Sequence, residues 1–180
     1  MSKILVHEFI SLDGVIESPS WTMEFGFDPR MGEAIAGIMG SCTGLLLGRR
    51  TFEMFAPAWS GRTADDDPGA PFMNQSPKYV VAGTQLAVEW NNTHVLGPYD
   101  PGAIRDLRER VDGDLYVSGS GQLVRGMLAD GLVDELHLFV YPVALGGGER
   151  LFAEPGEKTA FKLAASEAYA NGVVRLSYIP

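Results

Sequence analysis

The chain has 180 residues, enough for one domain with a buried core, and its 46% hydrophobic and 21% charged residues exclude a disordered protein. Its formal net charge of −9 disfavours nucleic acid and anionic membranes as partners, because both repel an acidic protein. The single cysteine, the N-terminus without signal-peptide features and the lack of a long uncharged apolar stretch predict a cytoplasmic protein.

Strands and helices alternate along most of the sequence. Short apolar or β-branched runs predict strands, and apolar residues at helical spacing predict helices. In chain order we expect a strand at 3–10, a loop at 11–29, a helix over 31–39, a strand at 43–48, a loop at 56–76, strands at 78–83 and 93–97, a helix that starts at Asp100, and a strand, glycine turn and helix over 114–131. Loops as long as the first two often act as lids.

The pattern changes near the C-terminus. Residues 133–145 predict another strand, and residues 161–180 predict a hairpin with Asn171 and Gly172 at its turn. Strand–helix units followed by antiparallel strands are typical of an α/β fold with three layers. We therefore expect one domain over 1–180, with a mixed, mostly parallel central sheet, flanking helices and an antiparallel C-terminal hairpin.

Two predicted strand-to-helix turns suit an anionic ligand. In LLLGRRT (45–51) a glycine precedes two arginines and a threonine, and in VSGSGQLV (117–124) two glycines flank a serine. Free N–H groups at a helix N-terminus bind phosphate, and glycine lets the phosphate approach the backbone. Because ligands of open α/β sheets collect at the carboxyl ends of the strands, we expect both turns at one site.

Each turn also has an ordinary explanation, as a solvated turn for the arginines and a tight turn for the glycines. The full G-x-G-x-x-G motif is absent because Val124 occupies the third glycine position, and neither a Rossmann glycine loop nor a P-loop occurs. Two separate anion sites nevertheless match a dinucleotide. Arginine beside the adenosine ribose favours the 2′-phosphate of NADP.

The order of these motifs resembles the dihydrofolate reductase superfamily. Most closely it resembles the branch with the reductase domain of the bifunctional riboflavin-pathway deaminase–reductase and its stand-alone bacterial relatives. The resemblance is carried by HEFISLDGVIE (7–17), LLLGRRTFEMF (45–55), SPKYVVAGT (76–84) and DLYVSGSGQLVRGMLADGLVDELHLFVYPVALGGGERLF (114–152). These segments stand in family order and cover nearly the whole chain.

The resemblance implies NADPH bound at the carboxyl edge of the sheet. The cofactor contacts that it implies are Gly14, Gly48, Arg49, Arg50, Thr51, Thr84, Ser118, Gly119, Ser120, Gly121, Gln122 and Leu123. Family members often have paired glycines at the second turn, whereas a serine separates the two glycines here.

Candidate catalytic and substrate residues come from the two long loops. Asp28 ranks first as the catalytic acid, with the N-cap of the next helix as its alternative role, and Asp13 is expected near the nicotinamide. The candidates for contact with a flat substrate are Trp21, Glu24, Phe27 and Trp59. Packing against the core is the alternative for the aromatic residues, and surface exposure is the alternative for Glu24.

No metal site is predicted. His7, His94 and His137 lack metal-ligand spacing, and His7 and His137 lie in predicted strands, where structural roles are expected. The acidic run at 65–67 predicts a solvated loop, and Cys42 predicts a buried, inert thiol.

The sequence thus predicts an NADPH-dependent reductase of a small heteroaromatic metabolite, either a riboflavin precursor or a pterin-like or folate-like compound. A zinc deaminase motif cannot be built from one cysteine, so the pathway stays open. The alternative is a non-catalytic nucleotide-binding or regulatory module on the same fold. Homodimerisation is expected, because the apolar segment LFVYPVAL (138–145) would be poorly protected as an edge strand.

Overall fold

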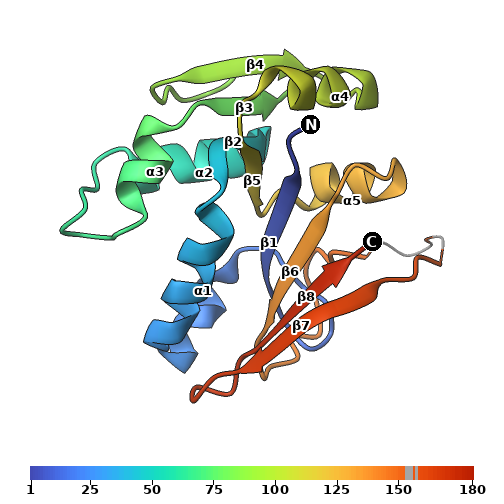
Figure 1. Cartoon of the computed structure of the whole chain (residues 1–180). Coiled ribbons are helices and arrows are strands. Elements are labelled where there is room, and N and C mark those ends of the chain that lie inside the picture. Colours follow the sequence, from blue (N-terminus) through green and yellow to red (C-terminus); the bar gives the residue numbers. More distant parts are fainter. Residues whose placement is uncertain (153–155, 157) are drawn as a thin grey trace.

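One eight-stranded sheet organises the chain in the computed structural model, which describes residues 1–152, 156 and 158–180 (Figure 1). The strands are β1 (Ile4–Ile10), β2 (Cys42–Gly48), β3 (Lys78–Val81), β4 (Thr93–Gly97), β5 (Asp114–Ser118), β6 (Glu135–Val140), β7 (Lys162–Ala168) and β8 (Val174–Ile179). Their order across the sheet is β4-β3-β2-β5-β1-β6-β8-β7. The pairs from β4 to β6 are parallel, whereas β8 runs antiparallel to β6 and β7. The predicted mixed sheet with an antiparallel C-terminal hairpin is confirmed.

Helices cover both faces of the sheet. They are the 3₁₀ helix η1 (Pro19–Phe25) and the α-helices α1 (Pro29–Met39), α2 (Arg49–Trp59), α3 (Ala70–Gln75), α4 (Pro101–Arg110) and α5 (Gly121–Ala129). One core cluster joins α4 and α5 to one face of the sheet. Two further clusters join α1, α2 and α3 to the other face. This arrangement is the predicted three-layer α/β fold.

The central strand β1 contributes to both layers because successive side chains of a strand point to opposite faces. Ile4, Val6 and Ile10 belong to the core beneath α4 and α5. Leu5 belongs to the core beneath α1, and Phe9 packs against that core. The same alternation governs the polar residues that lie between these positions.

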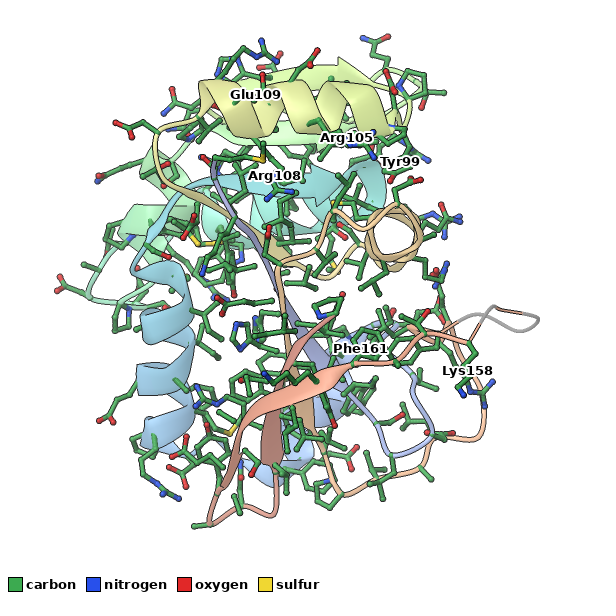
Figure 2. The ribbon with its side chains drawn as sticks, turned by 45° about the vertical axis from the view of Figure 1, so that its right-hand side comes forward. Tyr99, Arg105, Arg108, Glu109, Lys158 and Phe161 are labelled. Carbon is green, nitrogen blue, oxygen red and sulfur yellow. The ribbon has the colours of Figure 1, made fainter. Side chains whose placement is uncertain are left out.

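A buried ion pair ties α4 to the start of β6 and to the N-terminus. Arg108 points from α4 toward the sheet (Figure 2) and donates to the Asp134 carboxylate at 2.8 Å and to the Ser2 carbonyl at 2.7 Å. Asp134 also accepts from the Ile4 backbone N–H at 2.8 Å. Because Arg108 and Asp134 share these partners, the base of the sheet is fixed at the end opposite the predicted ligand turns.

The structure corrects three details. The predicted loop at 56–76 is shorter, because α2 continues to Trp59 and α3 occupies Ala70–Gln75. The C-terminal hairpin has a three-residue rather than a two-residue turn, since the Tyr169 N–H donates to the Val173 carbonyl. The segment 138–145 does not form an edge strand, because β6 pairs with both β1 and β8.

Among the residues that the structure describes, no helix has both the length and the apolar character needed to cross a bilayer.

Candidate functional site

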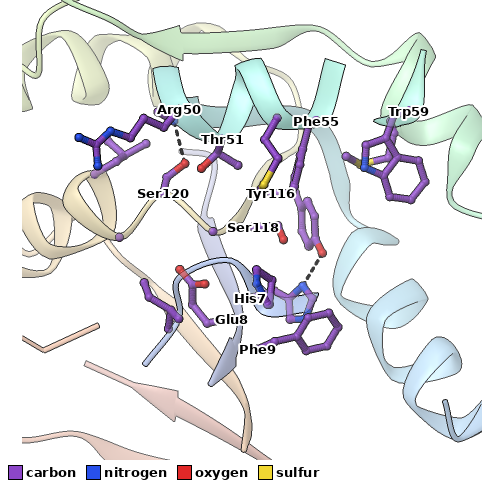
Figure 3. Close-up of a pocket in the computed structure, with 18 of the residues that line it drawn as sticks. His7, Glu8, Phe9, Arg50, Thr51, Phe55, Trp59, Tyr116, Ser118 and Ser120 are labelled. Carbon is purple, nitrogen blue, oxygen red and sulfur yellow. Dashed lines mark hydrogen bonds between the residues drawn. The ribbon is translucent and has the colours of Figure 1, made fainter. Parts of the chain in front are cut away.

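A large cavity opens at the carboxyl ends of β1, β2 and β5, with a volume of about 1430 Å³ (Figure 3). Known ligand pockets usually measure roughly 300–1,000 Å³, so this space can hold a dinucleotide together with a second molecule. Its position agrees with the rule that ligands of open α/β sheets lie beyond the carboxyl ends of the strands.

Both predicted ligand turns line this one cavity, from Gly48 to Thr51 and from Ser118 to Leu123. The turns also touch each other, because the Gly48 backbone N–H donates to Ser120 Oγ at 2.8 Å. The serine between the two glycines therefore joins the turns at the ends of β2 and β5. The sequence expectation that the two turns share a crevice is met.

The two helices that begin at these turns have uncapped N-termini. No side-chain cap serves α2 after Gly48 or α5 after Ser120. By contrast, Asp28 caps α1 and Asp100 caps α4 through hydrogen bonds to the backbone. The free N–H groups of α2 and α5 and the positive ends of their dipoles thus face the cavity, where an anion would satisfy them.

The backbone of the second turn allows very close approach. Gly119 and Ser120 both have positive φ angles, of +69° and +71°. A Cβ atom on Gly121 would lie 2.7 Å from Ile16 Cδ1 and 3.3 Å from Glu149 Oε1. A side chain at position 121 would therefore require Ile16 to shift and would narrow the mouth of α5.

The two arginines at the start of α2 differ in how available they are to a ligand at the first turn. Arg49 donates to Glu53 Oε2 at 3.0 Å, one helical turn away. Arg50 is exposed at the cavity and forms no ion pair with the residues that the structure describes. The Arg50 guanidinium can therefore bind an anion without losing a protein partner.

A second ion pair borders the other turn. Arg125 of α5 donates to Glu149 Oε1 at 2.7 Å and to the Arg150 carbonyl at 2.7 Å. Glu149 lines the cavity next to Gly121. A phosphate at the mouth of α5 would compete with this carboxylate for Arg125.

The cavity has a second lobe, which is mainly apolar, on the α1 side of the sheet. Its lining residues there include Phe9, Phe27, Ile35, Met39, Phe55 and Trp59. The Trp59 ring is covered on one face by Arg62, 4.9 Å from its centroid. Of the four residues predicted to contact a substrate, Phe27 and Trp59 line the cavity, whereas Trp21 and Glu24 do not. Trp21 instead packs edge-on against Tyr141 in the core, and Glu24 is exposed.

Both predicted acids occupy structural positions outside the cavity lining. Asp28 caps α1 and also accepts from the Ala170 N–H at 3.0 Å. Asp13 accepts from Ser11 Oγ and from the N–H groups of Leu145 and Gly146. These hydrogen bonds hold the pKa of each carboxyl below its usual range, so both stay ionised and neither is a ready proton donor.

Two of the predicted cofactor residues also lie outside this cavity. Thr84 is exposed and lines a separate, shallow depression, because β3 ends at Val81 and the chain turns away after Gly83. Gly14 adopts φ +84° in the loop after β1, where the cavity is lined instead by Ile16 and Glu17.

Three buried polar residues of the cavity floor were missed as site residues (Figure 3). His7 and Glu8 lie on β1, and Tyr116 lies on β5. His7 Nδ1 and the Tyr116 hydroxyl are 2.7 Å apart, whereas His7 Nε2 and Glu8 Oε1 have no hydrogen-bond partner among the residues that the structure describes. The signal in the sequence is that His7 and Glu8 stand side by side inside an otherwise apolar strand. Such a strand is buried, and histidine and glutamate are seldom buried without a specific role.

Burial shifts the pKa values of these groups strongly. Loss of hydration lowers the pKa of His7 to about 3, and His137 on the neighbouring strand adds to this effect. Loss of hydration raises the pKa of Glu8 to about 8 and moves that of Tyr116 above its usual range. At neutral pH the floor of the cavity thus presents a neutral imidazole, a phenol and a mostly protonated carboxyl.

The fold has three layers, with one sheet between two layers of helices, and two glycine-containing turns lie at the carboxyl edge of the sheet. This architecture is that of the dihydrofolate reductase-like fold class. A sequence model of the RibD C-terminal domain matches residues 2–175. The chain therefore belongs to the RibD C-terminal domain family.

Curated relatives and solved structures agree with this family. The uncharacterized Bacillus subtilis (strain 168) proteins YyaP and YwjB are 24% and 22% identical over 180 residues, which is 98% of this chain in both cases and 94% and 97% of the relatives. A crystal structure from Shewanella sp. PV-4, provisionally assigned to riboflavin biosynthesis, superposes with a TM-score of 0.80 at 23% identity, over 99% of this chain and 98% of the other.

Two further structures share the fold at lower identity. A pyrimidine reductase-like protein from Corynebacterium diphtheriae gives a TM-score of 0.67 at 15% identity, over 99% of this chain and 91% of that protein. The diaminohydroxyphosphoribosylaminopyrimidine deaminase/5-amino-6-(5-phosphoribosylamino)uracil reductase of Thermotoga maritima gives 0.65 at 14% identity. There the match covers 99% of this chain and 56% of the larger protein. The chain is therefore similar to proteins with a reductase-like fold.

Proposed function

We propose that this protein is an NADPH-dependent reductase that delivers hydride to a small, flat heteroaromatic metabolite, of the riboflavin-precursor or pterin and folate type. The observation that carries the proposal is the shared cavity. Two uncapped helix N-termini, one with adjacent arginines and one with flanking glycines, open into the same space as an apolar lobe.

The residues of the two turns fit a dinucleotide phosphate. The turn from Ser118 to Leu123 would hold the pyrophosphate through the N–H groups of α5, since Gly121 leaves no side chain in the way. The turn from Gly48 to Thr51 would hold the adenosine 2′-phosphate, with Arg50 as its main charged partner. The glycine-containing turn would thus bind the pyrophosphate of NADPH, and the arginine-containing turn would bind its 2′-phosphate.

NADPH, when bound, supplies a hydride from C4 of its dihydronicotinamide ring to an electrophilic carbon of the substrate. The apolar lobe would stack a flat ring between α1 and the end of α2 and exclude water from the transfer. His7 would orient the substrate by one hydrogen bond from its unpartnered Nε2, because its imidazole is neutral and is held by Tyr116.

A direct test is the binding of NADPH to the purified protein, followed by its oxidation in the presence of pterins and flavin precursors. Gly121→Val should weaken NADPH binding at least tenfold, because the added side chain meets Ile16 at the mouth of α5. Gly37→Ala is the matched control, since a Cβ there meets nothing within 4 Å on the outer part of α1. A wild-type protein that binds no NADPH would overturn the proposal.

One observation favours the non-catalytic nucleotide-binding module as a second candidate. Both acids expected from the sequence, Asp13 and Asp28, are held in structural hydrogen bonds away from the cavity. If NADPH binds but none of the tested ring compounds oxidises it, the module becomes the better description.

We also propose that the protein forms a homodimer, although the original reason for it no longer holds. The edge strand is β7, where nearly every side chain is exposed, including Leu163 at 52%. Edge strands with exposed apolar side chains are prone to pair with another chain, and a second copy would protect this one.

A further inference from the structure

Glu8 is a buried carboxyl whose position has no structural explanation among the described residues. Its exposure is 3%, and Oε1 has no hydrogen-bond partner. A buried polar group left unpaired destabilises the fold, so an apolar side chain at this position would make β1 more stable. The carboxyl is therefore better explained by a ligand than by the fold.

The side chain points into the half of the cavity where α5 begins. On β1, Val6 and Ile10 face the α4 and α5 layer, and Glu8 lies between them on the same side. Figure 3 shows its carboxyl directed toward the turn that carries Ser120, and the Gly119 N–H interacts with it. If a dinucleotide cofactor binds with its pyrophosphate at this turn, the nicotinamide end that follows the pyrophosphate would lie over Glu8.

Two charged groups face Glu8, Arg125 from α5 and Glu149 from the segment after β6. They pair with each other at 2.7 Å, so the charge of Arg125 is largely balanced by Glu149 rather than by the Glu8 carboxyl. Glu17 accepts from the Glu149 backbone N–H and lines the same wall. Among the groups around Glu8, loss of hydration therefore has the largest effect on the carboxyl, and it raises the pKa of Glu8 to about 8. At pH 7 the protonated form of Glu8 therefore predominates.

We propose that Glu8 binds the nicotinamide end of the cofactor, by donating its carboxyl O–H to the carbonyl oxygen of the ring carboxamide. This inference rests on the proposed NADPH site. A neutral acid suits a neutral amide, whereas a carboxylate would have no proton to donate and would repel the nearby pyrophosphate. Glu8 thereby fixes the ring over the end of β1, next to the lobe lined by Phe9.

The proposal predicts how binding depends on pH. The donor is present below the pKa of free Glu8 and is lost as the pH rises through it. NADPH affinity should therefore fall by at least fivefold between pH 7 and pH 9. The fragment 2′,5′-ADP, which has both ribose phosphates but no nicotinamide, should show no such loss. Glu8→Gln keeps an N–H donor, the shape and the charges of Arg125 and Glu149, and should bind NADPH equally well at both pH values.

The experiment is isothermal titration of wild type, Glu8→Gln and Glu8→Leu with NADPH and with 2′,5′-ADP. Glu8→Leu should weaken NADPH about tenfold at pH 7 and leave 2′,5′-ADP unchanged. The acetylpyridine analogue of NADP, which keeps the carbonyl but lacks the amide N–H₂, should lose affinity between pH 7 and pH 9 on wild type but not on Glu8→Gln.

The outcomes separate the two proposals. If 2′,5′-ADP does not bind wild type, the cofactor assignment itself is wrong. If it binds while Glu8→Leu leaves NADPH affinity intact, the cofactor site stands and the role of Glu8 is refuted. Should Glu8→Leu fail to fold, the pH profile of Glu8→Gln decides. A profile as steep as that of wild type would refute the role.

Discussion

The choice between NADPH and NADH can be tested at the arginine turn. Arg49 and Arg50 stand side by side at the start of α2, but Arg49 already donates to Glu53 at 3.0 Å and Arg50 is exposed at the cavity. A 2′-phosphate that binds Arg49 must share it with a carboxylate. We therefore expect Arg50→Ala to reduce the preference for NADPH more than Arg49→Ala.

The magnitude follows from the exposure of the site. A hydrogen bond to a charged group contributes about 1.5–3 kcal/mol when it is well shielded, and solvent lowers this for side chains as exposed as these. The lower end of this range, about 1.5 kcal/mol, corresponds to roughly a tenfold change in affinity. Arg50→Ala should thus weaken NADPH about tenfold and Arg49→Ala about threefold. The variant that lacks both arginines should bind NADPH and NADH about equally.

Glu53→Gln is the complementary change. Glu53 Oε1 accepts from the Ala87 N–H, and the glutamine oxygen preserves that bond. The neutral side chain releases the Arg49 guanidinium, so NADPH affinity should rise severalfold while NADH affinity stays constant. Titration calorimetry with both cofactors measures all these constants at one salt concentration. An NADPH-to-NADH ratio that none of the four variants changes would refute the assignment of the 2′-phosphate to this turn.

Four other substitutions test other parts of the molecule. Glu149→Gln should tighten NADPH binding severalfold and Arg125→Gln should weaken it, both by calorimetry, because a phosphate competes with Glu149 for Arg125. Asp13→Asn should flatten the pH dependence of the Tm below about pH 4: the depressed pKa of Asp13 contributes stability above its unfolded value of about 3.9, and this is lost on acidification. Light scattering should show a dimer that Leu163→Lys converts to a monomer, and a monomeric wild type would contradict the β7 interface.

Local sequence patterns predicted the sheet and the two turns because both depend on neighbouring residues. Apolar runs determine the buried strands, and Gly119, with its φ of +69°, allows a turn that few other residues can adopt. The first helix and the C-terminal hairpin follow from the same short-range signals. The two turns at the cavity could be located in the sequence for this reason.

The N-cap role of Asp28 was an alternative that the sequence offered locally, and the structure shows it. The remaining hydrogen bonds of both acids could not be predicted locally, because they depend on partners far along the chain. Asp13 is bound by the backbone of Gly146, and Asp28 by that of Ala170, which are 133 and 142 residues away. Thr84 was misplaced because the point where β3 ends is set by its pairing with β4. Whether Glu8 faces a cavity or a packed core likewise depends on which helix covers that face of β1.

The alternation along β1 also determines where hydride transfer would have to occur. Phe9 faces the apolar lobe beside α1, whereas Glu8 faces the half of the cavity at α5. Rings bound on these two sides are separated by the strand itself, and hydride transfer requires the reacting atoms to come within about 3–3.5 Å. They can meet past the end of β5, because β5 pairs with β1 as far as His7 and leaves the edge at Glu8 and Phe9 open to the cavity. The loop after β1, which turns at Ser11, then lines the cavity with Ile16 and Glu17.

That turn is fixed by a small hydrogen-bond network. Ser11 Oγ donates to Asp13 and accepts from the Val15 N–H, while the Ile16 N–H donates to the Glu149 carbonyl. The ionised Asp13 therefore holds the start of the loop from which Ile16 and Glu17 line the cavity. Under the proposed reductase function, loosening this turn should lower the rate of hydride transfer more than the affinity for either ligand.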